Sequence, residues 1–312
     1  MCEFTPKAIR DCLTVELQKY LQDKPENFLF NELALQMFVA RTLEKVFSSE
    51  EFKVHLEYSL PIDWNKTFKV GYESWETETP YIDIVLEKKA LIDGNSPEFV
   101  AIELKYKLKE AALPKDTSFL RFGEAPNSES NSEIVLVNHQ GAQDEGRYDF
   151  WKDVKRVELL TEAFPNIIGG FSLFLTNDPS YLEDNKHCKY SKFSFTSEKE
   201  AGLLFWNNNS SRCKAQPLCM QDDEQYFAVK YPKEKNLLLE SIKMTCLTCG
   251  KYKCCDYCGE KFKKGKSTIE RPNFYLKNSY KGEWFPNEKG FSDGLKQQLY
   301  CYSVVVPKWQ NR

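Results

Sequence analysis

The sequence predicts an α/β (α+β) protein built on an α-β-β-β-α-β succession, and three observations predict it. Apolar residues recur at helical spacing in two segments, 26–49 and 143–164. Three shorter segments of alternating pattern lie between them, and a buried apolar run, IIGGFSLFL, follows the second. With 312 residues, 41% of them hydrophobic, the chain has the composition of a folded globular protein and can bury a core.

The first half of this succession is a helix followed by three strands. The helical segment 26–49 places four apolar residues on one stripe: Leu33, Met37, Ala40 and Phe47. The strands follow at residues 53–60, 81–88 and 98–107. Two prolines and the run SESNS in residues 113–132 then predict a surface loop.

The second half is an amphipathic helix followed by strands. Its apolar face over residues 143–164 consists of Phe150, Val154, Val157, Leu160 and Phe164. We expect a buried strand at 167–178, short strand-like runs as far as residue 232, and a last strand at 299–307.

Composition also limits the cellular setting that we expect. The longest apolar stretch, 167–175, is far shorter than the ~20 residues of a membrane-spanning helix. The N-terminus lacks the apolar segment and cleavage site of a secretory signal, so we expect a cytoplasmic protein with no membrane partner. Because the net charge is −3, any binding of nucleic acid must be local.

Charged residues interrupt two of the predicted strands. Asp83 stands between apolar residues on the second strand, and alternation along the third puts Glu103 and Lys105 on one face. Isolated charges are costly to bury, so these side chains need either each other or a cation. Carboxylates and phosphate oxygens together are typical ligands of Mg²⁺, which indicates phosphate chemistry. The alternative is a salt-bridged group on a solvated strand edge.

Asp83, then after nineteen residues Glu103-Leu104-Lys105, on strands of an α-β-β-β-α-β core, resembles the PD-(D/E)xK, or restriction-endonuclease-like, nuclease superfamily. The resemblance covers about residues 27–178 and implies a central mixed sheet flanked by helices. It implies that Asp83 and Glu103 hold Mg²⁺ or Mn²⁺, and that Lys105 orients the attacking water or helps to deprotonate it. Glu32 resembles the additional acid that many members carry on the first helix.

Two further positions enter this comparison. Pro80 precedes Asp83 by three residues and not by one, which departs from the motif, although many members lack the adjacent proline. Members often carry a Gln or a basic residue on the helix after the catalytic strand. The residues that could approach phosphate or water there are Gln140, Gln143, Arg147 and Tyr148, with packing as the alternative for the last two.

A cysteine cluster indicates a second metal site. Five of the eleven cysteines fall within thirteen residues and form two Cys-x-x-Cys-Gly units, Cys246/Cys249 and Cys255/Cys258. Four thiolates satisfy tetrahedral Zn²⁺, so we predict one structural zinc ion, with Cys254 as an alternative ligand to Cys255. A redox-active dithiol, free thiols and an iron–sulfur centre are the other interpretations.

The residues around these cysteines are basic. Positions 251–271 carry an excess of four positive charges, and aromatic residues interleave with them. Such a segment can contact phosphate and stack bases, and a solvated basic face is the alternative. The nucleic-acid contacts that we expect are Lys251, Lys253, Lys261, Lys263 and Lys264.

These features predict three parts and one leading function. We expect a restriction-endonuclease-like core at 1–235, a zinc-binding insertion at 236–272, and a C-terminal segment at 273–312 that returns to the core. The expected function is Mg²⁺-dependent hydrolysis of DNA phosphodiester bonds by an endonuclease-like enzyme, and a homodimer would suit cleavage of both strands. The rivals are a non-catalytic nucleic-acid-binding or protein-interaction module with the same fold, and a nuclease that acts on RNA or structured DNA.

Overall fold

The structure is a computed structural model, and it describes the part of the chain that forms the main sheet and its helices. The described residues are 2–23, 29, 31–60, 81–90, 96–109, 111–114, 133–137, 143–183, 193–196, 198–204, 215–217, 244–246, 274–294 and 297–308. In these ranges three α-helices and a mixed seven-stranded sheet form an α/β fold. None of the described helices is both long and apolar enough to cross a membrane.

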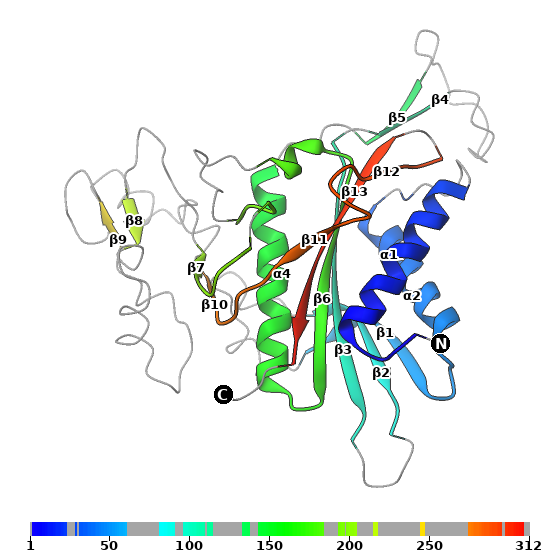
Figure 1. The fold of residues 1–312 in the computed structure, drawn as a ribbon, viewed down its shortest axis with the longest axis vertical. Helices are drawn as coiled ribbons and strands as arrows, with labels where there is room; N and C mark the ends of the chain where they lie inside the picture. Colours follow the sequence, from blue (N-terminus) through cyan, green and yellow to red (C-terminus); the bar gives the residue numbers. More distant parts are fainter. Residues whose placement is uncertain are drawn as a thin grey trace.

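The main sheet runs in the order β1-β2-β3-β6-β13-β11, with β12 paired to β13 (Figure 1). Its strands are β1 (Phe52–Ser59), β2 (Tyr81–Lys88), β3 (Glu98–Lys107), β6 (Ile167–Thr176), β11 (Gly282–Phe285), β12 (Phe291–Ser292) and β13 (Gln298–Pro307). Strands β3 and β6 are parallel, and the other pairs of this sheet are antiparallel. A parallel pair needs a crossover, and the connection from β3 to β6 contains helix α4 (Gln143–Ala163).

Short ribbons and one helical turn complete the described elements. The ribbons are β4 (Ala111–Pro114) with β5 (Glu133–Val137), β7 (Gly202–Leu204) with β10 (Phe274–Leu276), and β8 (Ala215–Pro217) with β9 (Met244–Cys246). A 3₁₀ turn, η4, covers Pro179–Leu182. Residues 113 and 114 therefore belong to a strand and not to the expected surface loop.

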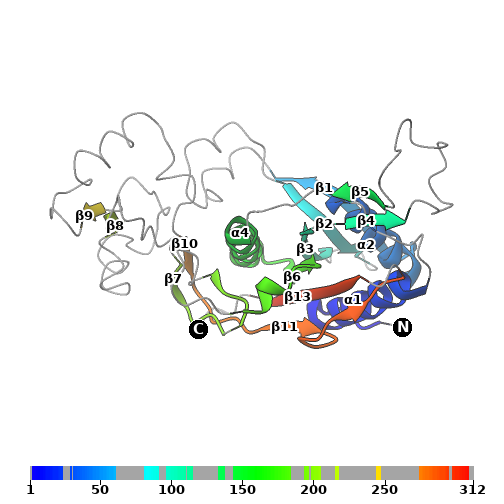
Figure 2. The ribbon, with the colours of Figure 1, turned by 90° about the horizontal axis from the view of Figure 1, so that it is seen from above.

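Helices cover both faces of the main sheet (Figure 2). Helices α1 (Pro6–Asp23) and α2 (Glu32–Val46) lie on one face, and α4 lies on the other. Strand β3 serves both cores, because Ile102 packs in the cluster that contains α1 and α2 while Ala101 packs in the cluster that contains α4. The alternation predicted for residues 98–107 is therefore confirmed, and Glu103 and Lys105 lie on the face toward α4.

Helix α1 covers residues to which the sequence analysis assigns no element. Its buried residues Ile9, Leu13 and Leu17 recur at every fourth position, and Thr5 caps it by accepting the Ala8 N–H at 3.3 Å. Charged and polar residues separate these apolar positions, so the stripe is narrow and the segment as a whole is not apolar. Packing against the sheet is what makes this helix stable.

The stripe predicted for α2 is wrong at two positions. Leu33 is 62% exposed and Met37 is 37% exposed, whereas Leu35, Val39 and Leu43 are buried. Apolar residues occur around most of this helix, so the sequence alone does not define the face that the sheet covers. The start of α2 is fixed by Asn31, whose side chain accepts the Ala34 N–H at 2.8 Å.

A buried carboxylate attaches the segment before β11 to helix α4. Glu158 has no exposed surface and forms an ion pair of 2.6 Å with the buried Lys155. Its other oxygen accepts the N–H groups of Lys277 and Asn278, at 2.9 and 3.0 Å, and the Tyr280 hydroxyl at 2.8 Å. Because a buried charge is tolerated only when it is paired and hydrogen-bonded, this network fixes residues 277–280 on α4.

We expect Glu158→Ala to lower the free energy of unfolding by about 3–5 kcal/mol, because it leaves the Lys155 ammonium buried without its partner. Glu162→Ala is the matched control, since Glu162 lies one turn further along α4 and its ion pair with Lys277 is one-third exposed on both sides. The control should cost no more than about 1 kcal/mol. Urea unfolding at neutral pH measures both, and equal losses would contradict the role given to Glu158.

Candidate active site

Strands β2 and β3 part at Asp83. The last residue pair in their antiparallel register is Ile84 with Ile102. Two residues further along the same edge of β3, the Leu104 N–H donates to the Asp83 carboxylate, with N and Oδ2 2.7 Å apart. This carboxylate thus replaces the backbone acceptor that a continued β2 would supply. The Asp83 carboxylate is therefore held beside Leu104, which is the residue between Glu103 and Lys105.

Glu32 reaches the same edge of β3 from the first turn of α2. The Tyr106 N–H donates to its Oε2 atom at 3.0 Å, and its Oε1 atom lies 3.4 Å from the Lys105 ammonium. The cap at Asn31 places Glu32 at the N-terminus of the helix, where the helix dipole favours a carboxylate. Glu32, the helix acid that the sequence analysis predicts for the site, is therefore adjacent to Lys105, the lysine that it predicts there.

Gln36 lies one turn beyond Glu32 on α2 and forms hydrogen bonds at the point where β2 and β3 separate. Its amide nitrogen donates to the Asp83 carbonyl at 2.8 Å and to Glu57 Oε1 at 2.7 Å. Glu57 has a φ of 47°, a left-handed conformation that is uncommon for a residue with a side chain. The β1–β2 register is the same before and after this residue, at Leu56–Ile84 and Tyr58–Ile82, so Glu57 lies opposite Asp83.

On the α4 face of the sheet, Glu103 is buried beside two charged residues of the helix. Its carboxylate is 2.7 Å from the Arg156 guanidinium, which also lies 3.3 Å from Asp153. Asp153 is in turn 3.8 Å from the Lys105 ammonium. The structure thus brings Asp83, Glu103, Lys105 and Glu32 to one region and adds Asp153 and Arg156 to it.

Burial and mutual repulsion shift the pKa values of these groups. Burial raises the pKa of Asp83 to about 6, against the opposing effect of the Leu104 N–H. Burial also raises the pKa of Glu103, the Arg156 guanidinium opposes that rise, and the charges of Asp83 and Asp153 add to it. Burial alone would lower the pKa of Lys105, but the carboxylates of Asp153 and Glu32 outweigh it, so this pKa is raised and the ammonium is retained.

The donor chemistry of this region fits a hard divalent cation. Its four carboxylates face two cationic side chains, so the group carries an excess of negative charge when all its members are ionised. Carboxylate oxygens are the ligands that Mg²⁺ prefers. Within the described ranges, no three His, Cys, Asp or Glu side chains form a ready-made metal site. Glu103 faces Arg156, so its binding of a cation requires this side chain to change partners, and Glu32 faces the β3 backbone.

The other predicted positions lie apart from this region or outside the described residues. Arg147 and Tyr148 are buried, and Arg147 donates to the Ser180 carbonyl at 2.6 Å while Tyr148 packs on Phe193. They are packing residues, as the alternative interpretation has it. Gln143 donates to Asp178 Oδ2 at 2.7 Å. Of Cys246 only the backbone is described, and the positions outside the described residues are Gln140, Cys249, Cys254, Cys255, Cys258, Lys251, Lys253, Lys261, Lys263 and Lys264.

Sequence reasoning missed three residues of the site. Asp153 and Arg156 flank the apolar stripe of α4 at a spacing of three, so a search for charged residues beside Val154 and Val157 would have found them. Gln36 is a polar residue on the buried face of α2, and a glutamine among buried aliphatic residues is the corresponding signal.

Comparisons of the chain with models of protein families, with curated proteins and with solved structures gave no match. The geometry of the site itself is therefore the basis for assigning a function.

The raised pKa of Asp83 predicts how the stability of the protein depends on pH. Because the folded protein holds this proton more tightly than the unfolded chain, the resulting stabilisation is complete below about pH 4 and is lost as the pH rises through about 6. Asp83→Asn removes this titration. We expect its stability relative to the unmodified protein to be higher at about pH 8 than at about pH 4, by up to about 3 kcal/mol.

Urea unfolding at the two pH values measures this difference. Glu44→Gln, which replaces an exposed acid on α2, is the control and should give the same change at both values. A pH-independent effect of Asp83→Asn would show that folding does not raise the pKa of Asp83.

Proposed function

We propose that this protein is a metal-dependent nuclease of the PD-(D/E)xK, restriction-endonuclease-like type that hydrolyses DNA phosphodiester bonds. One observation carries the proposal: where β2 and β3 part, Asp83 is fixed to the backbone between Glu103 and Lys105, and Glu32 and Asp153 approach the same lysine. Two acids and a lysine on neighbouring strands are the groups that the resemblance assigns to phosphodiester hydrolysis.

Each residue has a role that its position supports. Asp83 and Glu103 supply the carboxylates for Mg²⁺ or Mn²⁺, which, when bound, polarises the scissile phosphate and stabilises its developing charge. Lys105 keeps its proton beside Asp153 and Glu32, so it can orient the attacking water and offset negative charge on the phosphate. Glu32 fixes the position of Lys105 and of the β3 backbone at Tyr106.

Arg156 acts as the counterion of Glu103 before substrate binds. Its guanidinium lies between Glu103 and Asp153, at 2.7 and 3.3 Å. If Glu103 turned to a bound cation, Arg156 would be available to a phosphate oxygen, for which the guanidinium is well suited.

The cysteine cluster is the structural part of the proposal. Cys246, Cys249, Cys255 and Cys258 would hold one Zn²⁺ and stiffen a basic insertion, whose lysines would contact the phosphate backbone away from the reaction. All four positions of this zinc ion would be filled by thiolates, so it would have no part in hydrolysis.

Plasmid cleavage with Mg²⁺ or Mn²⁺ tests the nuclease. We expect Asp83→Asn and Lys105→Met each to lower the cleavage rate at least about 100-fold, because each removes a charge that acts on the reacting phosphate. Glu87→Gln is the matched control, since Glu87 lies on the same strand, pairs with His55 at 2.6 Å and does not contact the site. It should cleave at the rate of the unmodified protein.

Two results would reject the assignment. Cleavage that is unchanged in Asp83→Asn or Lys105→Met would show that the activity lies elsewhere. Metal-independent DNA binding without cleavage by the unmodified protein would favour the non-catalytic module. The structural observation that favours this module is the buried Glu103–Arg156 ion pair. Cleavage of RNA or of branched DNA in preference to plasmid would change the substrate and keep the site.

Zinc content tests the cysteine cluster separately. We expect a single zinc ion per chain by plasma mass spectrometry, and its loss in the double variant Cys249→Ser with Cys258→Ser. Cys12→Ser, which changes a half-buried free cysteine of α1, is the control and should retain the metal. Iron in place of zinc, or no metal, would contradict this part of the proposal.

A further inference from the structure

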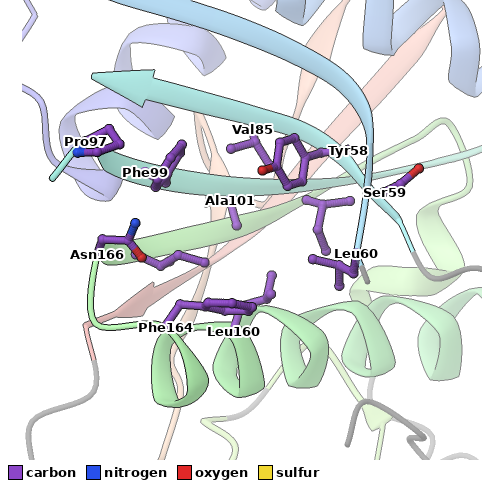
Figure 3. A pocket seen from close by; sticks show the side chains of 12 residues that line it. Tyr58, Ser59, Leu60, Val85, Pro97, Phe99, Ala101, Leu160, Phe164 and Asn166 are labelled. Atoms are coloured by element: carbon purple, nitrogen blue, oxygen red, sulfur yellow. The ribbon is translucent and has the colours of Figure 1, made fainter. Parts of the chain in front are cut away.

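An uncharged cavity lies beside the charged cluster, between the sheet and the C-terminal end of α4. Its volume is about 340 Å³, within the range of about 300–1,000 Å³ that is usual for ligand sites. Figure 3 shows Val85 and Phe99 of the sheet on one side, and Leu160 and Phe164 from the end of α4 on the other. None of the described residues that line it carries a charge, and such a lining suits a neutral ligand.

The cavity continues the seam that holds the candidate active site. Ala101 lines it, and Glu103 is two residues further along the same face of β3, about 6.6 Å at the usual rise of a strand. On the helix, Leu160 lines it and Arg156 lies one turn earlier. Strand β3 and helix α4 thus both contribute residues to the charged cluster and, next to it, to the uncharged cavity.

The lining has the chemistry of a site for a flat, uncharged ring with polar edges. Tyr58, Phe99 and Phe164 supply aromatic rings, and Tyr58 and Asn166 add polar groups to the same lining (Figure 3). Aromatic rings stack on bases, and a few polar groups can bond the edge of a base. A nucleotide joins such a ring to a phosphate, and the cationic groups of Lys105 and Arg156 are at the adjacent position.

We propose that this cavity receives an unpaired nucleobase of the substrate strand, with a neighbouring phosphate of that strand at the charged cluster. The inference rests on the proposed function, because it takes the phosphate from that site. A base can enter only if it leaves the stack, so the preferred substrate is single-stranded or locally unpaired nucleic acid.

Binding of a single-stranded DNA oligonucleotide that carries 2-aminopurine, measured with Ca²⁺ in place of Mg²⁺ to prevent cleavage, tests the cavity. Tyr58→Ala should weaken binding about fivefold or more and reduce the quenching of the 2-aminopurine, because one stacking surface is lost. The control is Tyr81→Ala. Tyr58 and Tyr81 are 38% and 49% exposed on paired strands, so neither change empties the core, and Tyr81 does not line the cavity. Asn166→Ala should weaken binding as well.

Several results would overturn the proposal. They are equal affinities of Tyr58→Ala and Tyr81→Ala for the oligonucleotide, unchanged 2-aminopurine fluorescence on binding, and binding of a fully paired duplex as tight as that of the single strand. Binding of the uncharged apolar dye Nile red that is lost in Tyr58→Ala, with oligonucleotide affinity unaffected, would identify a small-molecule site instead.

The two proposals fail in different ways. If the unmodified protein does not cleave nucleic acid but its oligonucleotide binding depends on Tyr58, the nuclease is rejected and the base cavity stands as part of a binding module. If the protein cleaves plasmid through Asp83 and Tyr58→Ala binds the oligonucleotide normally, the nuclease stands and the base cavity is rejected.

Discussion

The hydrogen bond between the Leu104 N–H and the Asp83 carboxylate is the constraint on which the site depends. Strand β3 continues past the end of its pairing with β2, and its next two N–H groups on that edge donate to Asp83 and Glu32. Buried backbone donors must be satisfied, so two acids complete the sheet where a strand would otherwise do so. The fold thus fixes the carboxylates beside Lys105 by the same bonds that stabilise the end of β3.

This arrangement concentrates charge in a buried region. Glu103 is 2% exposed and Asp153 is 3% exposed, and the guanidinium of Arg156 is an ion-pair partner of both. Charged groups of this kind are seldom the most stable choice for a core, and sites that reduce stability are typical of function. The raised pKa values of Asp83 and Glu103 follow from this burial and from the repulsion between neighbouring carboxylates.

The sequence was sufficient to predict individual strands and the face on which each of their residues lies. It was insufficient to predict which distant residues pack against them. Strand alternation placed Glu103 and Lys105 on one face, and the predicted bounds of β2 and β3 agree with the structure because turn-forming residues flank these strands in the sequence. The partners Asp153 and Arg156 are about 50 residues away from β3, and only the packing of α4 brings them close. The exposed face of α2 was assigned wrongly at Leu33 for the same reason, since α1 and the sheet decide which side is covered.

The distance between α4 and the sheet is set by two small residues, and both the charged cluster and the cavity depend on it. Gly170 of β6 pairs with Ala101 of β3, and a Cβ at position 170 would lie 2.6 Å from Val157 and 2.2 Å from the Ala101 carbonyl. A larger residue there would push α4 outward and separate Arg156 from Glu103. Val157 lies between Arg156 of the charged cluster and Leu160 of the cavity lining. The close contact of Val157 with Gly170 therefore fixes the position of α4 between the cluster and the cavity. The glycine is required here for close approach and not for a turn.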